Sequence, residues 1–316
     1  MFIVCTFLPK QIPCLCKLSW PINPFLILIM IQVVPRDPMA WLRSYLHGGT
    51  SSLFSTLTTM VTFPVYKTVF RQQLHNNLVR QAVKQLYREG PRKLYRGIIP
   101  PLVMKTLNGT LLFGLQDTIL HQLFSPSFTS LIPLSGFSAL AGLGAGGVEA
   151  IVFTPFERVQ NVLQNSQNDR NLPTLRSVLA RLANERPGIG LYCAFLPTLV
   201  RNALGSSLYF GLKDPLREAM ADQGLSPSAS SFVSGMVNSM AISLPLYPLS
   251  VLIANMQARV GKETVAGPME TWNALWESRQ RSVTLLYRGG SLVIVRSCLS
   301  WGITTAVYDQ LAQHAC

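Results

Sequence analysis

Six long apolar segments alternate with polar connectors along this chain of 316 residues. Each segment is long enough to cross about 30 Å of hydrocarbon as an α-helix. The connectors after the first, third and fifth segments are long, whereas the second-to-third and fourth-to-fifth connections are short. This alternation predicts an all-α membrane protein with six spanning helices, near residues 44–72, 100–123, 135–163, 195–220, 230–257 and 291–314.

The first long connector, residues 74–97, has its own helical pattern. Its apolar positions Val79, Ala82, Val83, Leu86 and Tyr87 recur at helical spacing among basic and polar residues. This spacing predicts a short amphipathic helix that lies along the membrane interface. The connectors at 165–193 and 258–288 occupy equivalent places.

A proline-to-glutamine frame marks each odd-numbered segment. Its copies are Phe63–Gln73, Thr154–Gln164 and Tyr247–Gln257, and each glutamine follows its proline by nine residues. An aspartate closes each even-numbered segment: Asp117, Asp214 and Asp309. Internal repetition of this kind indicates one domain over residues 44–314, with repeats near 44–125, 130–222 and 228–314.

Composition and charge agree with a membrane protein. The chain is 48% apolar and only 13% charged, whereas soluble chains carry about a quarter charged residues. The net charge is +13, but the basic residues lie between apolar segments and not along one polar face. This distribution favours an anionic solute or lipid surface over nucleic acid.

Residues 1–43 precede the repeats and are expected to form a disordered or interfacial extension; a targeting segment is the alternative. Its apolar run from Phe25 to Val34 is about half as long as a membrane span requires. The six cysteines and four histidines show no metal-ligand spacing, and no catalytic arrangement stands out. We therefore expect neither a metal site nor a cofactor, and no enzyme activity.

The repeated frame resembles the signature of the mitochondrial carrier family. That signature reads Pro-x-(Asp/Glu)-x-x-(Lys/Arg)-x-(Lys/Arg)-x-Gln, followed by (Asp/Glu)-Gly and an aromatic-basic-glycine turn. Here the later parts are Glu89-Gly90, Tyr95–Gly97 and Tyr287–Gly289, with a degenerate middle copy at Tyr192–Ala194. The resemblance implies a six-helix bundle with threefold pseudosymmetry in the mitochondrial inner membrane, with short helices on the matrix side. It also implies alternating access to a central cavity, a monomer, and contact with lipids that include cardiolipin.

The matrix gate of the family depends on ion pairs that this sequence lacks. The acid and base slots hold Tyr66 and Val69 in the first repeat, Glu157 and Gln160 in the second, and Ser250 and Ile253 in the third. Only Glu157 is charged, so these slots cannot form an opposite-sign pair. The bracing glutamines of the family are present as Gln73, Gln164 and Gln257. If packing closes this gate, replacing the three glutamines by alanine should change transport or stability little.

The cytoplasmic gate is also reduced. Of the bases that follow the three aspartates in the family, only Arg217 remains. The pair of Asp117 with Arg217 is therefore the most that these slots offer. Losing most ion pairs should lower the cost of opening both sides.

Candidate solute-binding residues follow from symmetry. Ionisable groups inside a membrane span are functional candidates by default. The positions thirteen residues before the three aspartates are Met104, Arg201 and Arg296, and Lys105 follows Met104. Glu149 adds one acid in the third segment. Guanidinium forks suit phosphate oxygens, so three cations and one acid suit an anionic nucleotide-type solute. Pairing of Glu149 with Arg201 or Lys105 is the structural alternative.

The first frame and Ser300–Gly302 are similar to a subgroup that includes the mitochondrial NAD carrier, whose cavity set falls on Lys105, Glu149, Arg201 and Arg296. NAD is therefore the leading solute. Two alternatives stay open: transport of another phosphate or carboxylate metabolite, and a carrier-like membrane protein that does not transport.

Overall fold

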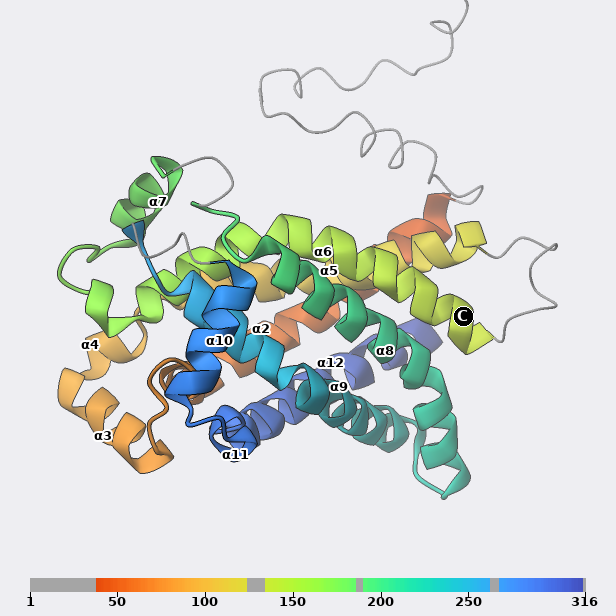
Figure 1. Ribbon diagram of the computed structural model, residues 1–316. Coiled ribbons are helices and arrows are strands. Elements are labelled where there is room, and N and C mark those ends of the chain that lie inside the picture. The colour runs from red at the N-terminus through yellow and green to blue at the C-terminus, as the bar shows by residue number, and fades with distance from the viewer. Residues whose placement is uncertain (1–37, 124–133, 186–189, 262–266, 315–316) are drawn as a thin grey trace, which may run out of the picture.

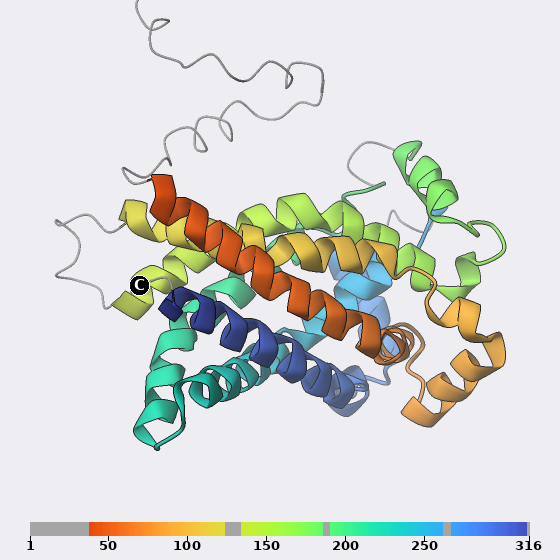
Figure 2. The ribbon, with the colours of Figure 1, turned by 180° about the vertical axis from the view of Figure 1, so that it is seen from behind.

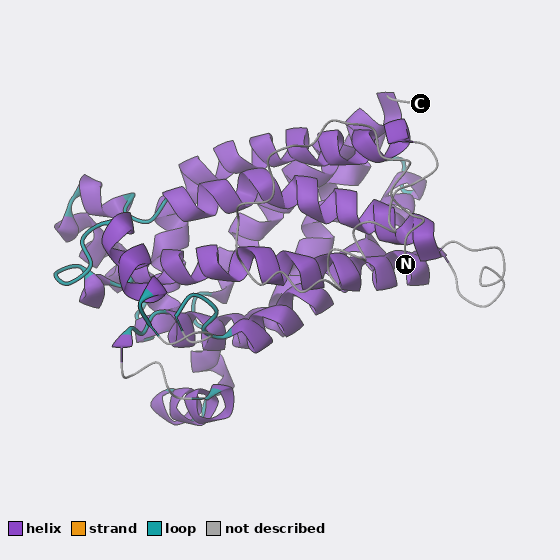
Figure 3. Ribbon diagram, turned by 90° about the horizontal axis from the view of Figure 1, so that it is seen from above, coloured by secondary structure: helices purple, strands orange, loops and turns teal. Residues whose placement is uncertain are grey.

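The computed structural model describes residues 38–123, 134–185, 190–261 and 267–314, and every regular element in these ranges is helical (Figures 1 and 3). The long helices are α2 (Pro38–His75), α5 (Ile99–Leu123), α6 (Leu134–Gln164), α8 (Phe195–Asp222), α9 (Pro227–Gln257) and α12 (Gly290–His314). The all-α prediction with six long helices is confirmed. Residues 38–43 belong to α2, although the sequence placed them in the extension; residues 1–37 lie outside the described ranges.

The long helices form a closed ring. Each packs against its neighbour in the sequence, and α12 returns to pack against α2 (Figure 2). Three of them are long and apolar enough to cross a membrane by length and composition alone: Ser135–Gln164, Pro227–Gln257 and Gly290–Gln310. The signature prolines Pro64, Pro155 and Pro248 lie inside their helices.

Small residues allow the two long helices of each repeat to approach closely. A Cβ atom on Gly142 would lie 2.6 Å from the Ser206 carbonyl oxygen of α8, and one on Gly235 would lie 2.8 Å from the Thr305 hydroxyl of α12. In the first repeat, a Cβ atom on Gly48 would clash with the Gly109 carbonyl oxygen of α5. Glycine at such contacts lets helix backbones pack tightly within a membrane.

The short helices gather at the end of the bundle where the proline-to-glutamine frames end (Figure 1). They are α3 (Val79–Glu89), α4 (Pro91–Leu94), α7 (Leu175–Ala183), α10 (Pro268–Ser278) and α11 (Val283–Leu286), with a 3₁₀ turn at Ser166–Asn168. α3 buries Ala82 and Leu86 and exposes Val79, Val83 and Tyr87. The amphipathic helix predicted from the sequence is therefore present, and its exposed apolar residues lie on the surface.

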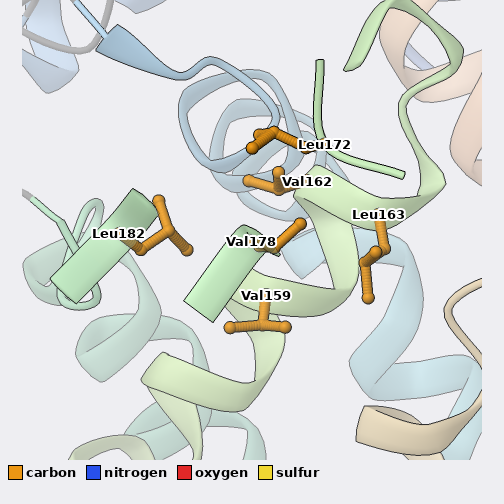
Figure 4. Packing of buried hydrophobic residues seen from close by; sticks show 6 residues of the cluster. All are labelled: Val159, Val162, Leu163, Leu172, Val178 and Leu182. Atoms are coloured by element: carbon orange, nitrogen blue, oxygen red, sulfur yellow. The ribbon is translucent and has the colours of Figure 1, made fainter. Parts of the chain in front are cut away.

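The second repeat shows how such a helix is held. Val178 and Leu182 of α7 pack on the last turns of α6 in a cluster of six buried side chains (Figure 4). The others are Val159, Val162, Leu163 and Leu172. This apolar contact holds α7 against the end of α6.

Candidate functional site

A cavity of about 350 Å³ lies inside the ring of helices. Every long helix contributes a polar side chain to its wall: Tyr66, Lys105, Glu149, Arg201, Ser243 and Arg296. Its volume is at the lower end of the range of about 300–1,000 Å³ that is typical of small-molecule sites. All four predicted solute-binding residues line this cavity, and so do the predicted gate residues Gln73 and Glu157.

Arg201 forms a two-pronged ion pair with Glu157. Its Nη1 and Nη2 atoms each lie 2.8 Å from a carboxylate oxygen of Glu157, and its Nε donates to the Asn202 side chain at 3.0 Å. Such bidentate pairing is the strongest arrangement available to a guanidinium and a carboxylate. The structural alternative of helix-to-helix pairing is thus realised, but with Glu157 and not with Glu149.

Glu149 has neutral partners. One carboxylate oxygen accepts a hydrogen bond from the Asn108 amide at 2.6 Å, and the other accepts one from the Ser206 hydroxyl at 3.5 Å. No described cation lies within ion-pair distance of this carboxylate. Its charge therefore remains available to a cationic group of a bound solute.

The other two cations face aromatic rings. The Arg296 guanidinium lies 4.8 Å from the centre of the Tyr66 ring, and the Lys105 ammonium lies 5.5 Å from the Trp301 ring. Among the described residues neither forms an ion pair with an acid, and Arg296 Nε is buried without a hydrogen-bond partner. A ring face holds a cation more weakly than a carboxylate does. Lys105 and Arg296 are therefore the cations that an incoming anion can engage.

Three residues at or beside the cavity carried no prediction: Asn202 and Trp301 line it, and Asn108 donates to Glu149 in its wall. Asn108 lies one helical turn after Lys105, and Asn202 follows Arg201 directly. Both are amide side chains inside apolar helices, close in sequence to a predicted cavity cation. That proximity is the sequence pattern that could have identified them. Trp301 also lines the cavity, with its ring 5.5 Å from the Lys105 ammonium.

The three bracing glutamines differ at the short-helix end. Gln257 accepts a hydrogen bond from the Asn161 amide at 2.7 Å and donates to the Cys193 carbonyl at 3.4 Å. The backbone carbonyl of Gln73 accepts from the Asn255 amide at 3.0 Å. Gln164 is buried, and neither polar atom of its side chain has a hydrogen-bond partner in the structure. The Gln257 side chain thus bridges α9 to α6, and the Gln73 side chain hydrogen-bonds to Tyr247 of α9, whereas the Gln164 side chain bridges no helices.

The gate residues at this end are closely packed. Val69 and Ile253, which occupy two of the signature base slots, are buried. The first long helices of the three repeats, α2, α6 and α9, contact one another. Phe70 of α2 packs against Ala254 and Ala258 at the end of α9. Apolar packing thus occupies the place where the family signature has charges.

The opposite end holds an ion pair that the sequence analysis missed. Lys213 Nζ lies 2.7 Å from an Asp309 carboxylate oxygen, so the pair joins α8 to α12. Arg217 lies 3.7 Å from the second Asp309 oxygen and 4.0 Å from Asp214, instead of pairing with Asp117 as expected. Asp117 accepts a hydrogen bond from the Ser44 hydroxyl at 2.6 Å. Lys213 was overlooked because it precedes Asp214, outside the slot where the signature places its base.

Aromatic rings lie between the cavity and these aspartates along the helices. Phe113 of α5 stacks on Tyr308 of α12 at 4.0 Å, and Tyr209 of α8 packs on Trp301 at 4.7 Å. These aromatic side chains come from α5, α8 and α12, the second long helix of each repeat. Along these helices they lie beyond Lys105 and Arg201, on the side of the aspartates.

Comparison with known proteins gives a consistent result. A family model described as mitochondrial carrier protein matches residues 37–127, 135–224 and 225–315. The chain is 46% identical over 277 residues to human solute carrier family 25 member 53, covering 86% of this chain and 88% of that protein. It is 36% identical over 259 residues to the human mitochondrial nicotinamide adenine dinucleotide transporter SLC25A51, covering 79% and 83%. A probable mitochondrial 2-oxodicarboxylate carrier of Schizosaccharomyces pombe is 24% identical over 293 residues, covering 89% and 96%.

Proposed function

Since this chain belongs to the mitochondrial carrier protein family and is a multi-pass transporter of the mitochondrial inner membrane, we propose that its solute is a dinucleotide such as NAD. The observation that carries the proposal is the separation of charges in the cavity. Lys105 and Arg296 face aromatic rings without an acid partner among the described residues, while Glu149 has only neutral partners. A solute with both anionic and cationic groups matches such a cavity better than a simple anion does.

The two kinds of charge have distinct roles. The planar guanidinium of Arg296 can donate two parallel hydrogen bonds to phosphate oxygens, whereas the ammonium of Lys105 acts as a point charge. The pyrophosphate of NAD would lie between them. Its pyridinium ring would lie near the Glu149 carboxylate, which the Asn108 amide orients. The relatives named for nicotinamide adenine dinucleotide transport support this proposal through their similarity over most of the chain.

Arg201 would connect solute binding to closure. It is held by Glu157, which occupies the acid slot of the second signature frame. A phosphate that competes for Arg201 would release Glu157, and closure at the matrix end would then rest on packing and on the hydrogen bonds of Gln257. We assign the matrix gate to Gln73, Gln164, Gln257 and Glu157, and the cytoplasmic gate to Asp117, Asp214, Arg217 and Asp309, joined by Lys213.

Direct uptake into liposomes tests the solute. Purified protein should take up labelled NAD saturably, and internal NAD should accelerate uptake if transport is an exchange. Arg296→Ala should lower uptake about 10- to 100-fold, because a hydrogen bond to a charged group contributes roughly 1.5–3 kcal/mol. Lys84→Ala is the matched control, since Lys84 is an exposed cation of α3 outside the cavity. Absence of NAD uptake by protein that is folded and reconstituted would contradict the proposal.

A second candidate is a smaller dianion. Lys105 and Arg296, the two cations without an acid partner among the described residues, also suit a dicarboxylate in a cavity of about 350 Å³, and a carrier named for 2-oxodicarboxylates is among the relatives. Glu149→Gln separates the two candidates. It should weaken uptake of NAD, which loses the partner of its pyridinium ring, and should strengthen uptake of a dicarboxylate, because it removes a like charge.

The lipid and oligomeric partners are part of the same proposal. We propose a monomer whose apolar outer side chains contact acyl chains and whose short-helix end binds the anionic headgroups of cardiolipin. Native mass spectrometry with and without added cardiolipin measures both properties in one experiment.

A further inference from the structure

The middle repeat lacks a cation that the other two repeats share. In the aromatic-basic-glycine turns the basic residue is Arg96 in the first repeat and Arg288 in the third, while the second has Cys193. A thiol is a weak hydrogen-bond donor without charge. Whatever the two arginines contribute must therefore come from elsewhere in the second repeat, or be absent.

Both arginines reach across to the next repeat. Arg96 donates to the Leu172 carbonyl at 2.5 Å and pairs with Asp169, in the segment that follows α6. Arg288 donates to the Asn76 carbonyl at 2.7 Å, directly after the end of α2. The first repeat is thus tied to the second, and the third to the first.

These contacts have a clear electrostatic basis. The last carbonyl groups of a helix have no partner within the helix and carry partial negative charge, which a nearby cation stabilises. A guanidinium can bond several such oxygens at once because its donors are fixed in a planar fork. Arg288 therefore fastens the end of α2 to the third repeat, whereas Arg96 is held by the Asp169 carboxylate and the Leu172 carbonyl in the connector after α6.

From the second repeat, Arg158 of α6 makes the contact that crosses to the next repeat. Its Nη1 donates to the Met256 carbonyl at 3.4 Å and to the Gln257 carbonyl, the last two residues of α9. Cys193 lies at the same place, with its sulfur 3.6 Å from the Met256 carbonyl oxygen. Two residues far apart in the sequence thus converge on one helix end, and only Arg158 carries a charge.

Arg158 is placed for this contact by its own repeat. Its Nε donates to the Gly190 carbonyl at 3.2 Å, Glu185 lies 4.0 Å from its Nη2, and its side chain is fully buried. A buried guanidinium is costly unless acceptors surround it, so this side chain is committed to the end of α9.

The equivalent positions of the other repeats behave differently. Lys67, three residues after the first signature proline, donates to the Lys93 carbonyl within its own repeat. The third repeat has Val251 at this position. Among the three equivalent positions, only Arg158 crosses to the next repeat, and it belongs to the repeat whose turn has no base. In the third repeat, which keeps Arg288, Arg279 also reaches the end of α2, with its Nη2 2.6 Å from the Gln73 carbonyl oxygen.

We propose that Arg158 replaces the missing base of the middle turn, and completes a cycle of three arginine contacts between successive repeats that holds the matrix end closed. Arg96 ties the first repeat to the second, Arg158 the second to the third, and Arg288 the third to the first. Arg158 is a positioning residue, since it acts on the end of α9 and does not line the cavity. The proposal is independent of the solute that the protein carries.

Maleimide labelling of Cys193 measures opening at this place. Burial shields this thiol and raises its pKa, so labelling is slow while the end is closed. In full-length protein whose other five cysteines are serine, Arg158→Leu should accelerate labelling about tenfold, the population change that about 1.4 kcal/mol produces. Lys67→Leu is the matched control and should leave the rate unchanged. Equal acceleration by both variants would overturn the proposal, because it would report general loosening.

A double-variant cycle tests the replacement itself. Arg158→Leu and Cys193→Arg should each lower Tm, the first by removing the cation and the second by adding another guanidinium beside Arg158. Combined, they should recover most of the loss, because one arginine again reaches the end of α9. A combined loss equal to the sum of the single losses would show that Arg158 does not stand in for the missing base.

Discussion

The Arg201 guanidinium binds both carboxylate oxygens of Glu157 at 2.8 Å. One partner belongs to the predicted solute-binding set and the other to a signature slot of the predicted matrix gate. The pair connects α8 to α6 within one repeat and faces the cavity. Binding and gating residues, which the sequence analysis treated separately, are therefore in direct contact.

This pairing predicts unequal effects of single and double substitutions. Arg201→Ala should destabilise the protein by up to about 3 kcal/mol, because it leaves the Glu157 carboxylate, which is largely buried, without its cation. Arg201→Ala combined with Glu157→Ala should cost less than Arg201→Ala alone. Thermal unfolding of the purified proteins measures both; a larger loss in the double variant would contradict this account of the pair.

At the cytoplasmic end, the structure predicts that the three aspartates are not equivalent. Asp309→Asn should destabilise the protein by about 3–5 kcal/mol, since it leaves the Lys213 ammonium without its carboxylate in a buried place. Asp214→Asn is the matched control: its side chain is 47% exposed, and the change should stay within about 0.5 kcal/mol. Similar losses for the two variants would show that the Lys213 pair does not stabilise this end.

Substitutions of the bracing glutamines Gln164 and Gln257 should have different effects on stability. Gln164→Met should be neutral or stabilise by about 1–2 kcal/mol, because both polar atoms of the buried Gln164 amide lack partners. Gln257→Met should cost about 2–3 kcal/mol, because it removes the bonds to Asn161 and Cys193. Unfolding temperatures of the two variants decide the matter. Equal losses would favour a common bracing role for the glutamines.

The backbone conformation of Ala194 predicts that a substitution there will stabilise the protein. It adopts a φ of 61°, in the left-handed region, whereas the glycines at the equivalent places, Gly97 and Gly289, have φ values of 84° and 95°. Ala194→Gly should stabilise by about 0.5–1 kcal/mol, the net of the relieved strain and the greater freedom of the unfolded chain. Gly97→Ala is the converse control and should destabilise, also because its Cβ would lie 3.1 Å from Leu163 Cβ. A lower Tm for Ala194→Gly would refute this interpretation.

The sequence by itself determined the architecture and the contents of the cavity. Apolar segments of membrane-spanning length and a thrice-repeated frame are local or periodic signals, so six helices and three repeats could be recognised without knowing how the chain packs. Symmetry between repeats also placed Arg201 and Arg296 at one depth. Lys105 was added as the neighbour of Met104, and Glu149 as an acid inside an apolar segment. All four line the cavity.

Only the tertiary structure decided which charges meet. Arg201 pairs with Glu157 and not with Glu149, Lys213 pairs with Asp309, and Arg158 reaches the end of α9. These partners lie between 44 and 99 residues apart in the sequence. Their meeting depends on the rotation and register of whole helices about the ring. A repeat pattern assigns each residue a depth and a face, but ångström-scale packing selects its partner.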